Sequence, residues 1–226
     1  MDLKNINIPD NITHIKIDIG LGMHNVYSKK WLQNEKNLFV YMFDPNPDSI
    51  NSSYNNTKNI ESDIIKNKND FYIIPVALSN IDYPSSLDFY SMVLDGGTSS
   101  LYKPIDPKLG PIKNKITVPV YSLKHFFDSF LWDRFEYIEY IKIDAQGADL
   151  DIIKSAGDYL RDKVVFITAE PEIMQYENCH HNTSENMEEY LKTQNFIKIN
   201  HPNTQDPTFI NNKFLHLIND IYICQI

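Results

Sequence analysis

Two glycines and an acid follow the first two apolar runs of the sequence. Gly20 and Gly22 come directly after the run His14–Ile19, and Asp44 directly after the run Leu38–Phe43. In an open α/β sheet, a glycine turn after the first strand lets a ligand approach the backbone closely. An acid after the second strand accepts hydrogen bonds from ribose hydroxyls. The pattern therefore predicts a site for a nucleotide-like ligand with a free ribose.

The glycine turn favours S-adenosylmethionine (SAM) over a dinucleotide. A dinucleotide fingerprint reads G-x-G-x-x-G, but Asn25 stands at the third glycine position, and the phosphate loop G-x-x-x-x-G-K-[ST] is absent. SAM has no pyrophosphate, so it tolerates fewer glycines, and its amino group favours a nearby acid such as Asp18. NAD remains the alternative ligand. Asp44 has an alternative role as a helix cap, because Asp is a good N-cap residue and Pro47 suits a helix start.

Residues at the ends of later runs complete the predicted cofactor site. Ala77 and Leu78 end the third apolar run and would flank the adenine ring with apolar surface. Asp63 is a weaker candidate for an adenine contact, and Asn46 belongs to the same short segment as Asp44. The predicted cofactor-binding residues are Asp18, Gly20, Gly22, Asp44, Asn46, Asp63, Ala77 and Leu78.

If SAM transfers its methyl group to a hydroxyl, a side chain must accept the hydroxyl proton. Asp144 ends the fourth apolar run and is our first candidate for that base, although it could instead cap a helix that begins near Gly147. Glu170 and His24 are the other catalytic candidates. The predicted acceptor contacts are Gln146, Ser99, Ser100, Glu172 and His125.

The same acids raise the question of a metal. Asp144, Glu170 and Glu172 carry the oxygen ligands that Mg²⁺ prefers. The sequence has no dedicated metal motif, and the adjacent pair His180 and His181 is poorly placed to share one ion. A divalent metal is therefore left open and is not predicted.

Alternating strand-like and amphipathic runs predict the scaffold that positions these residues. Such an alternation is typical of βαβ units, so we expect an α/β fold with a mostly parallel sheet. The expected strands are His14–Ile19, Leu38–Phe43, Phe71–Leu78, Tyr137–Ile143 and Val164–Ala169. The expected helices are Val26–Glu35, Asp48–Asn56, Leu123–Phe130, Ala148–Leu160 and Ser184–Gln194.

The sequence predicts one domain over residues 1–226, with two features that depart from plain alternation. Phe196–Asn200 and Ile221–Ile226 are expected to add two terminal strands, the last of them antiparallel, to make a seven-stranded sheet. The segment 79–120 contains several prolines and is expected to be an insertion that carries a hairpin, with strand-like runs at Leu87–Tyr90 and Lys115–Val120. Long loops on a rigid α/β scaffold are usually functional.

Several motifs, in order along the chain, resemble the FkbM family of SAM-dependent methyltransferases. They are Asp18–Gly20, Phe43–Pro47, Val76–Asn80, Gly97–Leu101, Val118–Leu123 and, as the most specific, Tyr140–Ala156 with the sequence YIKIDAQGADLDIIKSA. Two positions depart from the family pattern: His24 stands where glycine is common, and Gln146 stands where the family has an acid.

The resemblance implies a Rossmann-like class I methyltransferase fold and O-methylation, often of a sugar hydroxyl or a related polyhydroxylated molecule. Two other functions remain as alternatives. One is an NAD-dependent sugar oxidoreductase or epimerase. The other is a catalytically silent binding domain, which the residues at His24 and Gln146 would suit.

The composition of the sequence indicates which classes of partner and which cellular compartment to expect. A formal net charge of −9 argues against broad binding of nucleic acid or anionic membranes, since both need clustered Lys and Arg. The two cysteines form no CxxC pair, and no apolar run of about 18 residues occurs. We therefore expect a cytoplasmic, soluble enzyme with a small-molecule or glycan acceptor. The sequence does not indicate an oligomeric state.

Overall fold

The computed structural model describes residues 6–93, 96–172, 175–200 and 206–217. Its centre is a seven-stranded sheet in the order β3-β2-β1-β7-β8-β10-β9. The strands are β1 (His14–Ile19), β2 (Leu38–Phe43), β3 (Asp70–Ile74), β7 (Ile138–Ile143), β8 (Val164–Ala169), β9 (Phe196–Ile199) and β10 (Thr208–Asn211). The five strands from β3 to β8 are parallel, and β10 runs antiparallel to both of its neighbours. The predicted α/β class and mostly parallel sheet are confirmed.

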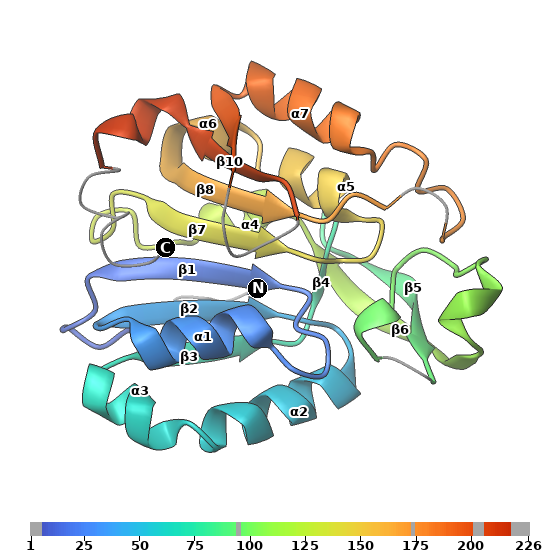
Figure 1. The fold of residues 1–226 in the computed structure, drawn as a ribbon, viewed down its shortest axis with the longest axis horizontal. Coiled ribbons are helices and arrows are strands. Elements are labelled where there is room, and N and C mark those ends of the chain that lie inside the picture. Colours follow the sequence, from blue (N-terminus) through green and yellow to red (C-terminus); the bar gives the residue numbers. More distant parts are fainter. Residues whose placement is uncertain (1–5, 94–95, 173–174, 201–205, 218–226) are drawn as a thin grey trace.

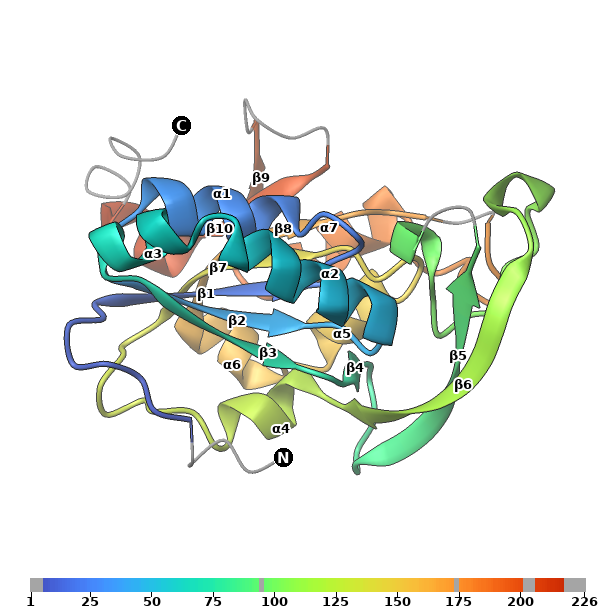
Figure 2. The same ribbon diagram turned by 90° about the horizontal axis from the view of Figure 1, so that it is seen from below.

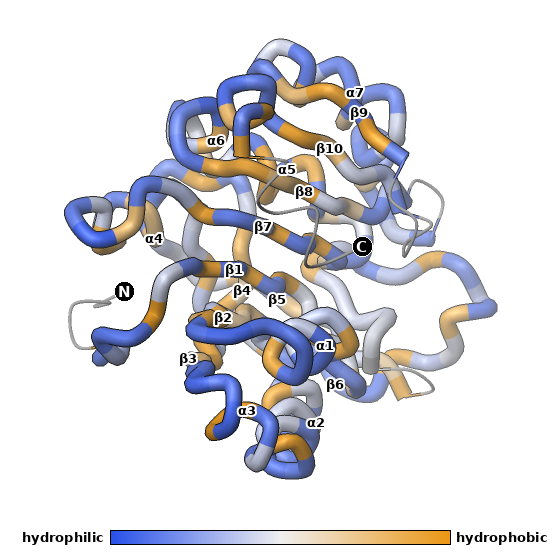
Figure 3. Tube along the Cα trace, turned by 60° about the vertical axis from the view of Figure 1, so that its left-hand side comes forward, coloured by the Kyte–Doolittle hydropathy of each residue, from blue (hydrophilic) through white to orange (hydrophobic). Residues whose placement is uncertain are grey.

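Helices cover both faces of this sheet (Figures 1 and 2). On one face lie α1 (Val26–Asn34), α2 (Pro47–Lys58) and α3 (Glu61–Asn67), and on the other lie α4 (Leu123–Phe127), α5 (Asp149–Lys154), α6 (Asp158–Lys163) and α7 (Ser184–Thr193). Hydrophilic stretches lie mainly in the helices and loops, and β1 and β7 also contain charged residues, whereas β2 and β8 are nearly continuous apolar runs (Figure 3). Strands buried on both faces need such runs, which is why β8 could be predicted with its observed bounds.

Proline and glycine account for two differences from the expected elements. The predicted strand Phe71–Leu78 is divided at Pro75, which lacks an N–H for the ladder, and Ala77–Leu78 forms β4 in a second sheet. The predicted helix Ala148–Leu160 is divided into α5 and α6 by Gly157, whose φ of 58° is left-handed.

Among the described residues, the antiparallel strand of the sheet is β10. The prediction placed it at Ile221–Ile226, which lie outside the described residues. The segment Thr208–Asn211 is short, but its four residues are buried between β8 and β9. This short strand is held in the sheet by hydrogen bonds to β8 on one side and to β9 on the other.

The expected insertion forms a small sheet of its own. It contains β5 (Ser85–Met92) and β6 (Ile112–Tyr121), which pair antiparallel, and β4 pairs parallel with the end of β6. Two short 3-10 turns, Gly96–Thr98 and Pro107–Leu109, lie between β5 and β6. Figure 2 shows this sheet extending from the edge where β1, β2 and β3 end. The insertion therefore stands beside the carboxyl ends of the parallel strands.

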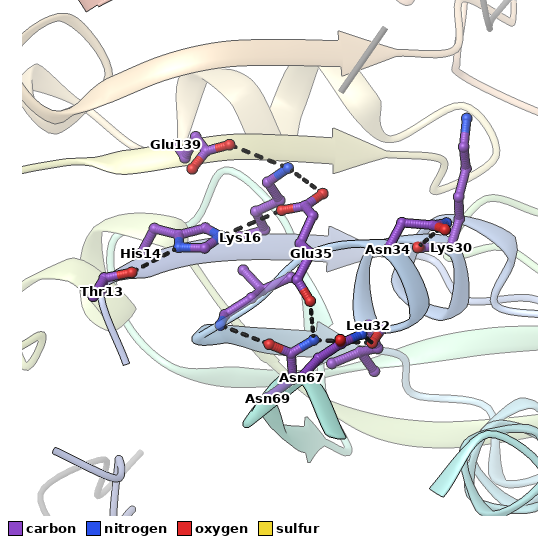
Figure 4. A network of polar contacts seen from close by, with 11 residues as sticks. Thr13, His14, Lys16, Lys30, Leu32, Asn34, Glu35, Asn67, Asn69 and Glu139 are labelled. Carbon is purple, nitrogen blue, oxygen red and sulfur yellow. Dashed lines mark hydrogen bonds and ion pairs between the residues drawn. The ribbon is translucent and has the colours of Figure 1, made fainter. Parts of the chain in front are cut away.

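A buried charge network fixes the opposite end of the sheet (Figure 4). Lys16 of β1 is fully buried, and its Nζ lies 2.7 Å from Glu35 Oε1 and 3.2 Å from Glu139 Oε1. The side-chain amide of Asn69 donates to the carbonyl oxygens of Leu32 and Glu35. A buried ammonium is tolerated only with such partners. The network ties α1, β1 and β7 together far from the glycine turn.

None of the helices in the described segments has both the length and the apolar character needed to cross a bilayer.

Candidate functional site

A pocket of about 480 Å³ opens at the carboxyl ends of the parallel strands. The glycine turn after β1, the residues that follow β2 and β7, and part of the insertion line this pocket. The residues that line it are Ile19, Gly20, Gly22, Phe43, Asp44, Pro45, Val76, Ala77, Leu78, Phe89, Gly97, Ser99, Leu101, Asp144, Ala145, Ala148 and Ile152. Ligands of open α/β sheets bind at this edge.

The two glycines of the turn are required by its backbone. Both have positive φ, 77° at Gly20 and 56° at Gly22. A Cβ on Gly20 would lie 1.7 Å from the carbonyl oxygen of Asp144, so the end of β1 packs directly on the end of β7. A Cβ on Gly22 would lie 3.4 Å from Cα of Gly97 in the insertion. The turn thus forms the contact between the sheet, the pocket and the insertion.

Asp44 faces this turn from β2. Its Oδ2 accepts from the backbone N–H of Leu21 at 2.9 Å, and its Oδ1 accepts from that of Asn46 at 2.7 Å. Burial raises the pKa of Asp44 to about 6, against the effect of these backbone donors. The cap of α2 is Asn46, whose side chain accepts from Asp48 N at 3.1 Å. Asp44 is therefore not the helix cap, and it lines the pocket.

Other predicted cofactor residues divide into two groups. Ala77 and Leu78 form an apolar wall of the pocket with Val76, Phe89 and Leu101. Asp18 and Asp63 form the second group, whose side chains do not line the pocket.

The carboxylate of Asp18 is almost fully buried and accepts from the backbone N–H and the hydroxyl of Ser28 in α1. Asp63 lies on α3, with its Oδ2 3.3 Å from Nε2 of Gln33. Neither side chain lines the pocket. The acid at the end of β1 instead ties the strand to the first turn of α1.

Neither predicted histidine is brought to the pocket. His24 is exposed in the glycine turn. His125 forms a capping box with Ser122 at the start of α4. The role of His125 is thus local, at the start of a helix.

A cluster of acids lies where β7 and β8 end. Asp144 accepts a salt bridge from Lys142, with Nζ to Oδ2 at 2.9 Å, and the same ammonium donates to the carbonyl of Gly20 at 3.2 Å. Gln146 donates from Nε2 to Asp144 Oδ1 at 2.6 Å and to Glu170 Oε2 at 3.2 Å. Asp144 thus does not cap the following helix, whose N-cap is Ala148. It stands between the pocket and Glu170.

These acids differ in protonation. Burial would raise the pKa of Asp144, but the charge and hydrogen bond of Lys142 lower it below its ordinary value. Burial and the neighbouring Asp144 raise the pKa of Glu170 to about 9. For Glu172, burial raises the pKa to about 7, and Asp144 adds to the shift. At neutral pH the structure therefore holds Asp144 ionised and Glu170 protonated.

The predicted serines of the insertion make contacts within the protein. Ser99 Oγ accepts from Met92 N at 3.1 Å and from Asn46 Nδ2 at 3.4 Å. Ser100 Oγ donates to the carbonyl of Gln146 at 2.6 Å. Ser99 also lines the pocket. The insertion is therefore joined to the ends of β2 and β7.

Residues 22–198 match the methyltransferase FkbM domain. The chain belongs to this family. The resemblance seen in the motifs is thereby confirmed, and the activity class of the family is methyl transfer. No curated protein matched by sequence.

Solved structures similar to this FkbM domain include methyltransferases of low sequence identity. A human methyltransferase 10 domain containing protein is 10% identical, with 89% of this chain and 73% of that chain covered and a TM-score of 0.42. The METTL16 MTase domain is also 10% identical, with coverages of 88% and 60% and a TM-score of 0.43. The N-terminal domain of human METTL16 in complex with SAH is 10% identical, with coverages of 89% and 62% and a TM-score of 0.41.

Three residues of the FkbM domain were missed as parts of its site. Lys142 is the one cation of β7, and both it and Asp149 belong to the motif Tyr140–Ala156, a signal that the sequence did contain. Asp149 is fully buried in α5 and accepts from the backbone N–H groups of Ala145 and Glu170, each at 3.1 Å. Tyr176 lies in a loop, and its hydroxyl reaches Gln146 Oε1 at 2.9 Å. No local pattern could have identified Tyr176.

A metal centre finds no support in the described segments. No group of three or more His, Cys, Asp or Glu side chains there is arranged to hold an ion. Asp144 and Glu170 are instead bridged by the amide of Gln146, and the ammonium of Lys142 pairs with Asp144.

Proposed function

We propose that this chain is a SAM-dependent O-methyltransferase that methylates a hydroxyl of a sugar or glycan. The observation that carries the proposal is the carboxyl group of Asp144, paired with Lys142, on the wall of a pocket built by the glycine turn and Asp44. Family membership supports methyl transfer. The acceptor is inferred from the chemistry of the surrounding residues.

The pocket suits SAM on three grounds. The turn at Gly20 and Gly22 places backbone rather than side chains against the ligand. Asp44 has two oxygens and about four acceptor positions, of which the backbone N–H groups of Leu21, Gly22 and Asn46 use three. The remaining position would accept from a ribose hydroxyl. Apolar residues, Ala77 and Leu78 among them, would enclose the adenine.

Bound SAM would supply an activated methyl group, and the protein must supply position and a proton acceptor. A neutral hydroxyl is a poor nucleophile, so its proton must leave as the oxygen attacks. Asp144 is the ionised acid at the pocket, and Lys142 keeps it so. Glu170 already carries a proton at neutral pH and would donate a hydrogen bond instead. We therefore assign proton acceptance to Asp144.

The acids around this position favour a neutral acceptor with several hydroxyls. Asp144, Glu170 and Glu172 offer oxygen atoms that accept hydrogen bonds, and Lys142 is already engaged by Asp144. An anionic acceptor would meet unfavourable charge, whereas a sugar hydroxyl would meet hydrogen-bond acceptors. This supports the sugar or glycan class implied by the family resemblance.

Cofactor choice is tested by calorimetry with S-adenosylhomocysteine and NAD. We expect the purified chain to bind S-adenosylhomocysteine at micromolar concentration and NAD at least 100-fold more weakly, because the turn after β1 has Asn25 in place of the third glycine that a pyrophosphate needs. Tight NAD binding would point to the oxidoreductase alternative. No binding of either at millimolar concentration would point to a silent domain. Methyl-labelled SAM, incubated with neutral glycans, nucleotide sugars and small polyols, then identifies the acceptor.

Replacing Asp44 with alanine tests the ribose contact. One hydrogen bond to a charged carboxylate, worth about 2 kcal/mol, is lost, so we expect S-adenosylhomocysteine to bind roughly 30-fold more weakly. The matched control is Asp63→Ala, which removes an acid of the same type on α3, outside the pocket. The control should retain the affinity of the parent. Equal losses in both variants, or none in Asp44→Ala, would remove Asp44 from the cofactor site.

A further inference from the structure

The side chain of Gln146 joins two carboxyl groups and a phenol at the edge of the pocket. Its Nε2 lies 2.6 Å from Asp144 Oδ1 and 3.2 Å from Glu170 Oε2, and its Oε1 accepts from the hydroxyl of Tyr176 at 2.9 Å. An amide offers two N–H donors and one carbonyl oxygen. Both N–H groups therefore have partners, and the carbonyl oxygen shares the single proton of the Tyr176 hydroxyl with the carbonyl of Thr98.

The backbone and surroundings of Gln146 hold this side chain in place. Its φ is 54°, in the left-handed region, and its carbonyl accepts from Ser100 Oγ at 2.6 Å. Tyr176 is fully buried, and its hydroxyl also reaches the carbonyl of Thr98 at 2.8 Å. The reverse orientation of the amide would turn its oxygen towards two carboxyl groups. The carboxyl pair therefore dictates which end of the amide faces it.

We propose that Gln146 is a positioning residue, whose amide holds the carboxyl groups of Asp144 and Glu170 side by side so that one proton serves both. This positioning role of Gln146 rests on the proposed function in one respect: Asp144 is taken to accept the proton of the substrate hydroxyl. Gln146 itself does not exchange a proton. It holds the carboxyl groups of Asp144 and Glu170, which do. Its contacts with Ser100 and Tyr176 connect these carboxyl groups to the insertion and to the loop after β8.

The charges that face the pair fit one shared proton. Asp144 and Glu170 hydrogen-bond to each other, which requires a proton on one of them. Lys142 stabilises the ionised form of Asp144. The other charged groups that face the pair are all acids, and each disfavours a second negative charge: Asp18, Asp149, Glu172 and Asp206.

A Gln146→Glu variant tests the contact through the pH dependence of folding. The new carboxyl would replace N–H donors at 2.6 and 3.2 Å from two carboxyl oxygens, so the folded protein must bind an additional proton. A group with a raised folded pKa loses stability as pH rises from its unfolded to its folded value. Between about pH 5 and 8, we expect the folding equilibrium constant to fall about tenfold more per pH unit than in the parent.

The measurement is urea unfolding at several pH values, with carboxyl NMR of glutamate-labelled protein as a direct record of the new group. Gln194→Glu is the matched control, because that amide, at the end of α7, donates only to the hydroxyl of Thr193 in the described structure. It should retain the parent's slope. Gln146→Met, which adds no charge, should lose stability yet also retain that slope.

Two outcomes would overturn the positioning role. One is a Gln146→Glu variant whose folding follows the parent's pH dependence, and the other is a new carboxyl that titrates at its ordinary value. Should Gln146→Glu fail to fold at pH 7, the extra proton predicts recovery at pH 5, and no recovery there would also contradict the proposal. These readouts need no cofactor, so they are independent of whether S-adenosylhomocysteine binds.

Discussion

Gly20→Ala is expected to remove a large part of the protein's free energy of unfolding at 25 °C. The added Cβ would lie 1.7 Å from the carbonyl oxygen of Asp144 and 2.7 Å from its carbonyl carbon. Both atoms belong to the backbone at the end of β7, which pairs with β1 and with β8 and cannot move alone. The φ of 77° adds strain for any side chain. We expect a loss of at least about 4 kcal/mol, a large part of the stability of an ordinary domain.

The matched control for this substitution is Gly157→Ala. Gly157 also has a positive φ, 58°, but an added Cβ meets only the flexible end of Lys124, at 3.9 Å. The backbone strain is thus kept and the collision is removed, so we expect a loss of about 1 kcal/mol. Urea unfolding followed by circular dichroism measures both. Similar losses in the two variants would mean that the end of β1 does not pack on the end of β7 as described.

Scaffold elements were predictable where one local signal decided them. The strand at 164–169 is apolar and β-branched, is bounded by polar residues, and is buried along its whole length. The helix expected at 148–160 failed because its apolar spacing continues through Gly157, and the sequence does not say whether a glycine in such a run takes a left-handed conformation. Periodicity reports which face is buried, and it does not report where the backbone turns.

Site residues were predictable where topology alone assigns them to an edge. The carboxyl ends of parallel strands meet at one edge, so Gly20, Asp44 and Asp144 were brought together as expected. Asp18 shares that edge, but alternate side chains of a strand point to opposite faces, and its carboxylate joins α1. The contact of Tyr176 with Gln146 depends on a loop path, which residue types do not encode.

Asp144→Asn is expected to lower turnover by 10² to 10⁴ while leaving cofactor binding within about twofold. A positioned general base contributes a rate factor of that size, equivalent to about 3 to 5 kcal/mol of activation free energy. The amide oxygen of the variant can still accept from Lys142, which limits the cost of leaving a buried ammonium without its partner. Turnover should be expressed per folded molecule, counted by titration with S-adenosylhomocysteine.

Glu170→Gln is the isosteric control that separates the two acids. Glu170 is protonated at neutral pH, so a neutral amide reproduces its charge and can still donate a hydrogen bond to Asp144. We expect its turnover at pH 7 to remain within about tenfold of the parent's. The reverse result, with Glu170→Gln inactive and Asp144→Asn active, would assign the base to Glu170. It would also mean that Lys142 does not decide which acid of the pair is ionised when the acceptor is bound.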